Sequence, residues 1–297
     1  MSETTTQPSP PRLRMFALAT MGLALCFAIQ LWKLAGFVVK DDLQSYIPLM
    51  PPLSGYLVWY QREKLPRNSV PALTSAIIFS AAGLCMVAWW HTTRLAGENG
   101  LSLAMLAFLL LLAGSGCIFL GGTLMRAVAF PFGLLVFIVP LPTFLRNWIE
   151  AGLQHGSAKV AEWLFALSDL PVFREGMFFQ LPGMRLEVAP ECSGIHSTLV
   201  LFITSLLAAW MFLRRPWSRA ILVLAVVPLA LARNGFRILI IGELCTRIGP
   251  EMINSPIHRH GGPLFFVLSL LPFFLLLYFI KKSELPRAPR PLPSAVN

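Results

Sequence analysis

The segment of residues 101–121, LSLAMLAFLLLLAGSGCIFLG, decides the fold class of this protein. It contains no Asp, Glu, Lys or Arg. An α-helix of this length rises about 31 Å, which matches the hydrocarbon core of a bilayer. Similar apolar stretches recur along nearly the whole chain of 297 residues. The sequence therefore predicts an all-α, polytopic bundle of transmembrane helices.

The composition excludes an ordinary soluble domain. Apolar residues make up 56% of the chain and charged residues only 13%, with a mean hydropathy of +0.68, whereas globular domains contain about 25% charged residues. The net charge of +10 comes from Lys and Arg that lie between apolar runs, where membrane topology explains them. Because no basic groove or base-stacking motif accompanies them, we expect no nucleic-acid partner.

About eight spans are expected. They cover residues 15–32, 44–60, 70–90, 101–121, 124–141, 192–213, 219–242 and 262–280. The start of the chain resembles a signal sequence, but no small-x-small cleavage site follows, so we interpret it as a retained first helix. The polar stretches 1–14 and 283–297 are expected to be disordered cytoplasmic tails around one membrane domain, residues 15–282.

The distribution of Lys and Arg predicts the orientation. One set of alternate connections and tails carries 13 of these residues, and the opposite short connections carry five. Positive residues are retained on the cytoplasmic side, so both termini are expected in the cytoplasm. The protein should then lie in a bacterial cytoplasmic membrane, with the long connection 142–191 facing outward.

That outer connection has its own predicted structure. From Trp148 to Leu167, apolar residues alternate with charges in a way that favours a helix lying in the membrane interface. Further on, apolar residues alternate on both sides of Pro182-Gly183, which is typical of a short β-hairpin with a tight turn. The hairpin leads directly to Cys192.

Cys192 opens the sixth predicted span at its outer end. One interpretation is a small apolar residue at a helix start. The other is a nucleophile, because a thiol near a helix N-terminus gains thiolate character from the unpaired N–H groups and the helix dipole. The five cysteines are scattered and form no CxxC pair, which argues against a zinc or thioredoxin-type motif.

Two arginines, Arg233 and Arg237, lie one turn apart in the seventh predicted span, on either side of Asn234. Guanidinium groups are costly in lipid, so their shared face should point into the bundle or a wet cavity. Counting about 1.5 Å per residue from the cytoplasmic side places Arg237 near the outer surface. A structural ion pair is the alternative.

Three histidines lie near the same predicted outer boundary. His258 and His260 precede the last span, and His196 follows Cys192 by one helical turn, so spacing alone makes His196 the nearest base to the thiol. Neither cysteine pairs nor an HExxH pattern accompany these histidines, so we predict no metal site.

A thiol, an arginine and a histidine at one water boundary suit acyl transfer. The thiolate attacks a carbonyl, the guanidinium stabilises the oxyanion and the imidazole protonates the leaving group, without a cofactor. Two other functions fit these residues. One is a membrane thiol oxidoreductase that uses Cys192 and Cys245. The other is a transporter or polysaccharide-export component with an arginine-lined anion path.

These motifs resemble the exosortases, a family of membrane-embedded cysteine transpeptidases. The resemblance rests on Glu187-Val188-Ala189 leading into Cys192-Ser193-Gly194-Ile195, on Asn234-Gly235-Phe236-Arg237-Ile238, and on His258 followed by Gly262. It extends to Phe130-Pro131 and to Val139-Pro140-Leu141-Pro142. These motifs occur in order on the expected spans.

The resemblance implies Cys192 as nucleophile, Arg237 as the oxyanion or orienting residue and His258 as the acid or base. His196, Asn234, Arg233 and His260 are possible supporting residues. His196 stands where the family more often has arginine, which leaves a second base beside the thiol. The implied partners are membrane lipid, an acceptor nucleophile and secreted proteins with a C-terminal signal, in which a Pro-Glu-Pro-like motif (PEP-CTERM) precedes a hydrophobic span and a basic tail.

Overall fold

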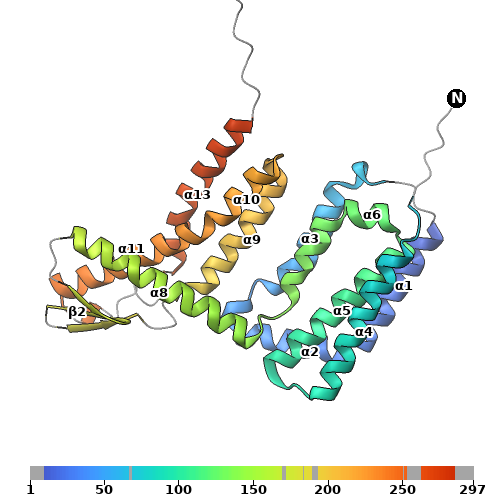
Figure 1. The fold of residues 1–297 in the computed structure, drawn as a ribbon, viewed down its shortest axis with the longest axis horizontal. Coiled ribbons are helices and arrows are strands. Elements are labelled where there is room, and N and C mark those ends of the chain that lie inside the picture. Colours follow the sequence, from blue (N-terminus) through green and yellow to red (C-terminus); the bar gives the residue numbers. More distant parts are fainter. Residues whose placement is uncertain are drawn as a thin grey trace, which may run out of the picture. The chain divides into compact units, whose positions relative to one another are not determined.

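Helices make up most of the described chain, with one small sheet beside them (Figure 1). The computed structural model describes residues 10–66, 69–168, 172–182, 184–188, 193–249, 251–252 and 262–284. It divides into two compact units, Met1–Arg146 and Asn147–Asn297. The single membrane domain expected over 15–282 therefore contains two separately packed parts.

The first unit begins with α1 (Pro10–Cys26), which starts inside the predicted tail 1–14, and α2 (Ala28–Lys40). Two long helices, α4 (Leu73–Thr93) and α5 (Gly97–Phe119), pack against each other in this unit. Short elements complete the unit: η1 (Asp42–Gln44), η2 (Ile47–Leu49), α3 (Met50–Tyr60), η3 (Arg62–Lys64), α6 (Gly122–Ala127), α7 (Ala129–Gly133) and η4 (Leu134–Ile138).

Small residues allow α4 and α5 to approach closely. A Cβ added at Gly114 of α5 would lie 2.3 Å from Oγ of Ser80, and one at Gly83 of α4 would lie 2.8 Å from Leu111. Close backbone approach at small residues is typical of helices that associate in lipid. Leucines and isoleucines on the other face of α4, such as Ile77, are more than half exposed. This apolar face is suited to contact acyl chains.

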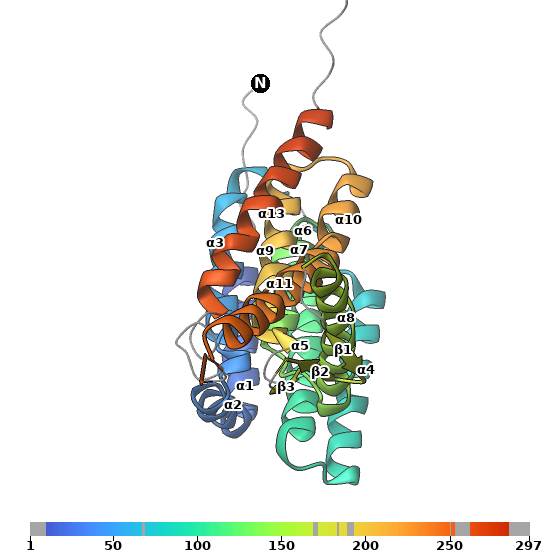
Figure 2. The same ribbon diagram turned by 90° about the vertical axis from the view of Figure 1, so that its left-hand side faces the viewer.

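The second unit contains most of α8 (Thr143–Leu167), a three-stranded antiparallel sheet and four further helices. The strands are β1 (Phe173–Glu175), β2 (Phe178–Leu181) and β3 (Met184–Glu187), in the order β1-β2-β3. The helices are α9 (Ile195–Phe212), α10 (Pro216–Leu224), α11 (Val226–Arg247) and α13 (Gly262–Glu284). Figures 1 and 2 show the sheet beside α8 and α11, where a buried apolar cluster joins them.

The described residues of the connection 142–191 contain the predicted helix and hairpin with one addition. The hairpin is present as β2 and β3, with Phe179 opposite Leu186 and Leu181 opposite Met184, and β1 adds a third strand. The predicted surface helix is α8, and a 93° bend separates it from the short helices before it. Its tryptophans, Trp148 and Trp163, are 75% and 67% exposed, as suits a helix at the membrane interface.

Five described helices are long and apolar enough to span a membrane, and up to seven if each of two bent pairs is one span. The chain is therefore a multi-pass membrane protein. The predicted span 15–32 is divided between α1 and α2 by a 71° bend. The predicted number of about eight differs at two further places. Residues 44–60 form η2 and the 11-residue α3, which at about 16 Å is too short to cross alone. Residues 124–141 break into α6, α7 and η4.

Prolines account for the interruptions within residues 44–60 and 124–141. Pro51 and Pro52 lack the N–H that would continue a helix from η2, so α3 starts at this point with proline in its first turn. Pro131 and Pro140 act in the same way in the region of α7 and η4. By contrast, α13 tolerates Pro272 and runs to Glu284, two residues into the predicted tail 283–297.

Within the first unit, members of the two sets of positive residues lie at opposite ends of α4 and α5. At one end, Arg12 donates a hydrogen bond to the carbonyl of Ser69, which precedes α4, and Thr123, which follows α5, donates to the Ser69 hydroxyl. At the other end, Lys33 and Glu98 line one cavity. This arrangement agrees with the alternation used to predict the topology.

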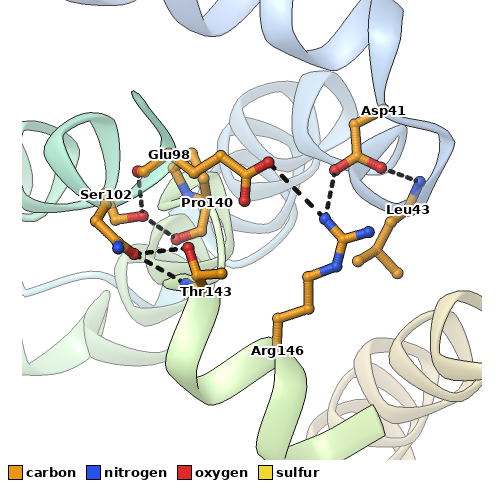
Figure 3. Close-up of polar contacts among 8 residues, drawn as sticks. Asp41, Leu43, Glu98, Ser102, Pro140, Thr143 and Arg146 are labelled. Carbon is orange, nitrogen blue, oxygen red and sulfur yellow. Dashed lines mark hydrogen bonds and ion pairs between the residues drawn. The ribbon is translucent and has the colours of Figure 1, made fainter. Parts of the chain in front are cut away.

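Arg146, at the start of α8, holds two carboxylates of the first unit (Figure 3). Its Nη1 lies 3.2 Å from Oδ2 of Asp41 and 3.9 Å from Oε1 of Glu98. The side chain of Arg146 is 29% exposed and that of Asp41 17%. The partial burial reduces screening by water, so this cluster fixes the first turn of α8 more firmly than a surface pair would.

Hydrogen bonds between the start of α5 and the segment that begins α8 add to this cluster (Figure 3). Asn99 Oδ1 accepts hydrogen bonds from the N–H and the hydroxyl of Thr143, at 2.9 and 3.0 Å. The Ser102 hydroxyl donates to the carbonyl of Pro140 at 2.8 Å. The start of α5 therefore fixes where α8 begins.

We expect Arg146→Gln to lower the free energy of unfolding by about 1 kcal/mol, because two carboxylates lose their partner. Thermal unfolding in detergent measures the effect, as a decrease in Tm of about 2–4 °C. Arg94→Gln is the control, because Arg94 forms no ion pair among the described residues. Equal Tm values for the two variants would contradict a stabilising role for the cluster.

Candidate active site

Gly194 caps the N-terminus of α9 and can only be glycine there. Its φ of 67° and ψ of 24° lie in the left-handed region, which other residues adopt at a cost. A Cβ at this position would lie 2.5 Å from Oδ1 and 2.6 Å from Nδ2 of Asn234, and 2.9 Å from Nη2 of Arg233. Both the left-handed backbone conformation and the lack of space for a Cβ therefore favour glycine at position 194.

Asn234 and Arg233 hold the backbone around this cap. The side-chain amide of Asn234 donates a short hydrogen bond to the carbonyl of Ser193. Arg233 Nη2 donates to the carbonyl of Gly194 at 3.3 Å and to Oγ1 of Thr198 at 3.2 Å. Nε and Nη2 of Arg233 both lie 3.2 Å from Oδ1 of Asn234. The two side chains are hydrogen-bonded to each other, and together they bind the carbonyl groups of residues 193 and 194.

Both side chains are buried, Arg233 at 8% exposure and Asn234 at 3%. Burial makes each of these hydrogen bonds costly to lose, because a buried donor without an acceptor retains its desolvation penalty. One nitrogen of Arg233, Nη1, is buried and meets no acceptor among the described residues. An oxygen atom of a ligand placed beside Nη1 could therefore accept a hydrogen bond from this charged group.

Glycines on α11 bring α8 close to the site. A Cβ on Gly235 would lie 2.6 Å from Val160 of α8, and one on Gly242 would lie 2.6 Å from Phe165. The two glycines are seven residues apart and therefore share a face of α11. The packing that they allow places α8 and the sheet beside the segment that carries Arg233 and Asn234.

Val188, the last described residue before Ser193, is anchored by the sheet and by α8. Val188, which follows β3, is 1% exposed. Its N–H donates to the carbonyl of Met177 at 2.9 Å, and its carbonyl accepts a hydrogen bond from Nε2 of Gln154 on α8. The described backbone on this side therefore ends at a residue held by both the sheet and α8.

The structure describes four of the seven sequence-predicted site residues. Arg233, Asn234 and Arg237 lie in α11, and His196 is exposed in the first turn of α9. Arg233 and Asn234 contact the α9 cap, and Arg237 is partly buried one turn further along. Cys192, His258 and His260 lie outside the described residues.

Cys245 is the second cysteine of the thiol oxidoreductase considered from sequence. Cys245 has a free thiol, is 3% exposed and belongs to the apolar cluster that contains Phe165 and Phe179. No group of three or more metal-ligating side chains occurs among the described residues.

Sequence reasoning missed Thr198 and Gln154. Thr198 lies four residues after Gly194, one turn into α9, and its hydroxyl also donates to the Gly194 carbonyl at 2.8 Å. That spacing is a signal for a side chain that closes the first turn of a helix. Gln154 carries no comparable signal, because its partner Val188 is 34 residues away in the chain.

The arrangement is suited to stabilise negative charge beside the start of α9. The first turn of a helix presents unpaired N–H groups and the positive end of its dipole. The buried guanidinium of Arg233 lies at the same helix end, and Arg237 follows one turn later. A thiolate or an oxyanion at this position would be favoured over its neutral form.

Comparison with known proteins identifies the family of the chain. A family model described as transmembrane exosortase (Exosortase_EpsH) matches residues 32–275, which is most of the chain. Searches of curated proteins and of solved structures gave no significant match. The match runs from within α2 to within α13 and includes the sheet and the α9 cap, whereas α1 lies outside it. The chain therefore belongs to the transmembrane exosortase family.

Proposed function

We propose that this protein is a membrane-embedded cysteine transpeptidase with Cys192 as its nucleophile. The observation that carries the proposal is the grip of Arg233 and Asn234 on Ser193 and Gly194, the two residues that directly follow Cys192. Membership of the exosortase family supports the same reaction class. Burying the guanidinium of Arg233 costs desolvation free energy. We interpret this cost as a consequence of the need to hold the backbone beside Cys192 accurately in place.

In the proposed reaction the Cys192 thiolate attacks the carbonyl carbon of the scissile peptide bond. The resulting oxyanion is stabilised by Arg237, and the carbon–nitrogen bond then breaks while His258 protonates the departing amine. This leaves a thioester on Cys192. A nucleophile of the acceptor attacks that thioester, and the thiol of Cys192 is released with the new bond formed.

The proposed substrates are secreted proteins with a C-terminal PEP-CTERM-like signal. The hydrophobic part of such a signal would enter the membrane as a helix and present its polar motif at the outer face, where the Lys and Arg distribution places the start of α9. Nη1 of Arg233, which has no acceptor among the described residues, is suited to bind an oxygen of the substrate. The protein would act in a bacterial cytoplasmic membrane with both termini inside.

Two observations weaken the other functions considered from sequence. A thiol oxidoreductase needs Cys245 to be accessible, whereas its thiol is buried in an apolar cluster, and such cysteines are inert. An arginine-lined anion path needs Arg233 to face an open channel. Arg233 does line a cavity of about 320 Å³, but all other lining residues except Ser269 are apolar. Nε and Nη2 of its guanidinium are hydrogen-bonded within the group formed by Gly194, Thr198 and Asn234.

Covalent trapping tests the proposed nucleophile directly. A peptide that carries the C-terminal signal and an electrophile at its cleavage site should form an adduct on Cys192, located by mass mapping. The buried Cys245 and the exposed Cys26 serve as internal controls within the same chain. An adduct at Cys26 with none at Cys192 would overturn the proposal.

Arg237→Lys should reduce signal cleavage by about 10²-fold, because Lys keeps the charge but loses the planar fork that binds an oxyanion or carboxylate through two N–H groups. Accumulation of uncleaved substrate in membranes measures the effect. Arg247→Lys is the matched control on the same helix, where Arg247 pairs with Glu243 at 2.6 Å and is 73% exposed. Equal cleavage by the two variants would remove Arg237 from the mechanism.

A further inference from the structure

The first unit contains a cavity of about 770 Å³ that the proposed reaction does not use. It lies where the start of α1, the end of α3 and the turn between α5 and α6 meet. Its walls are mostly apolar, with Val58, Leu124, Val128 and Phe132 among the lining residues. A cavity of this size between helices of a membrane protein is large enough for a flexible ligand.

Ser54 is the polar side chain in the wall, and it is already satisfied. It is 7% exposed and donates a hydrogen bond to the carbonyl of Pro131 at 2.8 Å. Because this hydroxyl already donates a hydrogen bond, the apolar part of the wall provides few hydrogen-bonding groups for water or a sugar. The walls therefore favour a hydrocarbon chain over a polar molecule.

Charged side chains lie at the edge of the same cavity. Arg14 from α1 and Arg62 from η3 both line it and are exposed, as is Glu63. Neither arginine forms an ion pair with a carboxylate among the described residues. The guanidinium of Arg62 lies 4.6 Å from the ring centroid of Trp59, which limits its freedom. Two arginines and one glutamate leave a net positive edge beside an apolar interior.

The cavity also lies at the end of the first unit where the positive residues gather. Arg12 donates a hydrogen bond to Ser69 at this end, and Gln61, next to Arg62, donates to the carbonyl of Ala127. By the Lys and Arg distribution this end faces the cytoplasm, where anionic lipids make the membrane surface negative. Basic pockets between helices at that face bind anionic lipid headgroups.

We infer that this cavity binds an anionic phospholipid, with its phosphate between Arg14 and Arg62 and an acyl chain between Val58 and Phe132. A soluble anion would explain the arginines but not the apolar walls, and a neutral lipid would explain the walls but not the arginines. The inference is independent of the chemistry at Cys192. It assigns a structural lipid to the first unit.

Photo-cross-linking of the full-length protein in lipid nanodiscs tests this inference. The probe is phosphatidylglycerol with a diazirine in its acyl chain, and the comparison probe is phosphatidylcholine with the same chain. Peptide mapping should find phosphatidylglycerol on α3, α6 and α7 well above the phosphatidylcholine level. Arg14→Gln and Arg62→Gln should each lower this labelling by about fivefold, the effect of about one surface charge on lipid binding.

Two further variants separate the headgroup from the acyl chain. Arg94→Gln removes a charge at the opposite end of α4 and should leave the labelling unchanged. Val58→Trp fills part of the cavity and should abolish labelling although both arginines remain. Circular dichroism and thermal unfolding confirm that each variant is folded.

Equal labelling by the two lipids would overturn the inference, because it would indicate ordinary lipid around the helices. Unchanged labelling in the double variant Arg14→Gln/Arg62→Gln would overturn it as well. Glycerol 3-phosphate at millimolar concentration separates lipid from soluble anion. Displacement of the probe by this headgroup alone would replace the lipid with a soluble phosphate compound, whereas persistent labelling supports the lipid.

Discussion

Replacing Cys192 by alanine is expected to abolish cleavage of C-terminal sorting signals, with a loss of at least about 10³-fold. Removal of a nucleophile leaves only the rate acceleration due to binding and charge stabilisation. The substrate should then accumulate uncleaved in the membrane, which immunoblotting of membrane fractions measures. The variant protein itself should insert normally, because the contacts of Ser193 and Gly194 with α11 do not involve the thiol.

Cys26→Ala is the matched control, because it makes the same chemical change at an exposed cysteine of α1. Its cleavage rate should equal that of the unmodified protein. Normal signal cleavage in the Cys192→Ala variant would show that another group performs the reaction, and the transpeptidase proposal would fail.

Gly194→Ala is expected to reduce cleavage by about 10²-fold without removing any functional group. The new Cβ would sit 2.5 Å from Oδ1 of Asn234, so either the cap or the Arg233–Asn234 unit must shift. A displacement of about 1 Å near a reacting group costs about this factor. Cleavage assays at equal membrane content measure the effect.

Gly176→Ala separates the steric effect from backbone strain. Gly176 has a φ of 63°, close to the 67° of Gly194, but nothing lies within 4 Å of its added Cβ. Both variants carry the cost of a left-handed alanine, about 1 kcal/mol. Only Gly194→Ala should lose cleavage. Equal losses in the two variants would show that strain alone is responsible and that the contact of Arg233 and Asn234 with the cap is unimportant.

The membrane fold followed from the sequence wherever a span was long and uninterrupted. The segment 101–121 corresponds to α5 (Gly97–Phe119), and 262–280 lies within α13, because an apolar run of that length has no stable alternative to a buried helix. Shorter runs with prolines were less informative. For 44–60, hydropathy indicated a span, but backbone N–H groups missing at Pro51 and Pro52 limit α3 to 11 residues.

The hairpin was predicted, but the third strand was not. Alternation around Pro182-Gly183 indicates two strands directly. The strand β1 has only three residues, too few to show an alternating pattern. It is held by pairing with β2 and by an ion pair at 2.8 Å between Arg174 and Glu162 of α8. The pairing with β2 is local, because only Gly176 and Met177 separate the two strands, but a strand of three residues is too short for hydropathy to distinguish from a loop.

The sequence by itself determined that this is a multi-pass helical membrane protein and that Cys192, Arg233, Asn234 and Arg237 were candidates, because hydropathy, residue type and spacing are local properties. Only the tertiary structure decided that Arg233 donates a hydrogen bond to the Gly194 carbonyl at the start of α9. Arg233 and Gly194 are 39 residues apart, and their contact depends on how α9 and α11 pack. The same packing explains Gly194, whose missing Cβ leaves room for two side chains that the sequence alone does not place beside it.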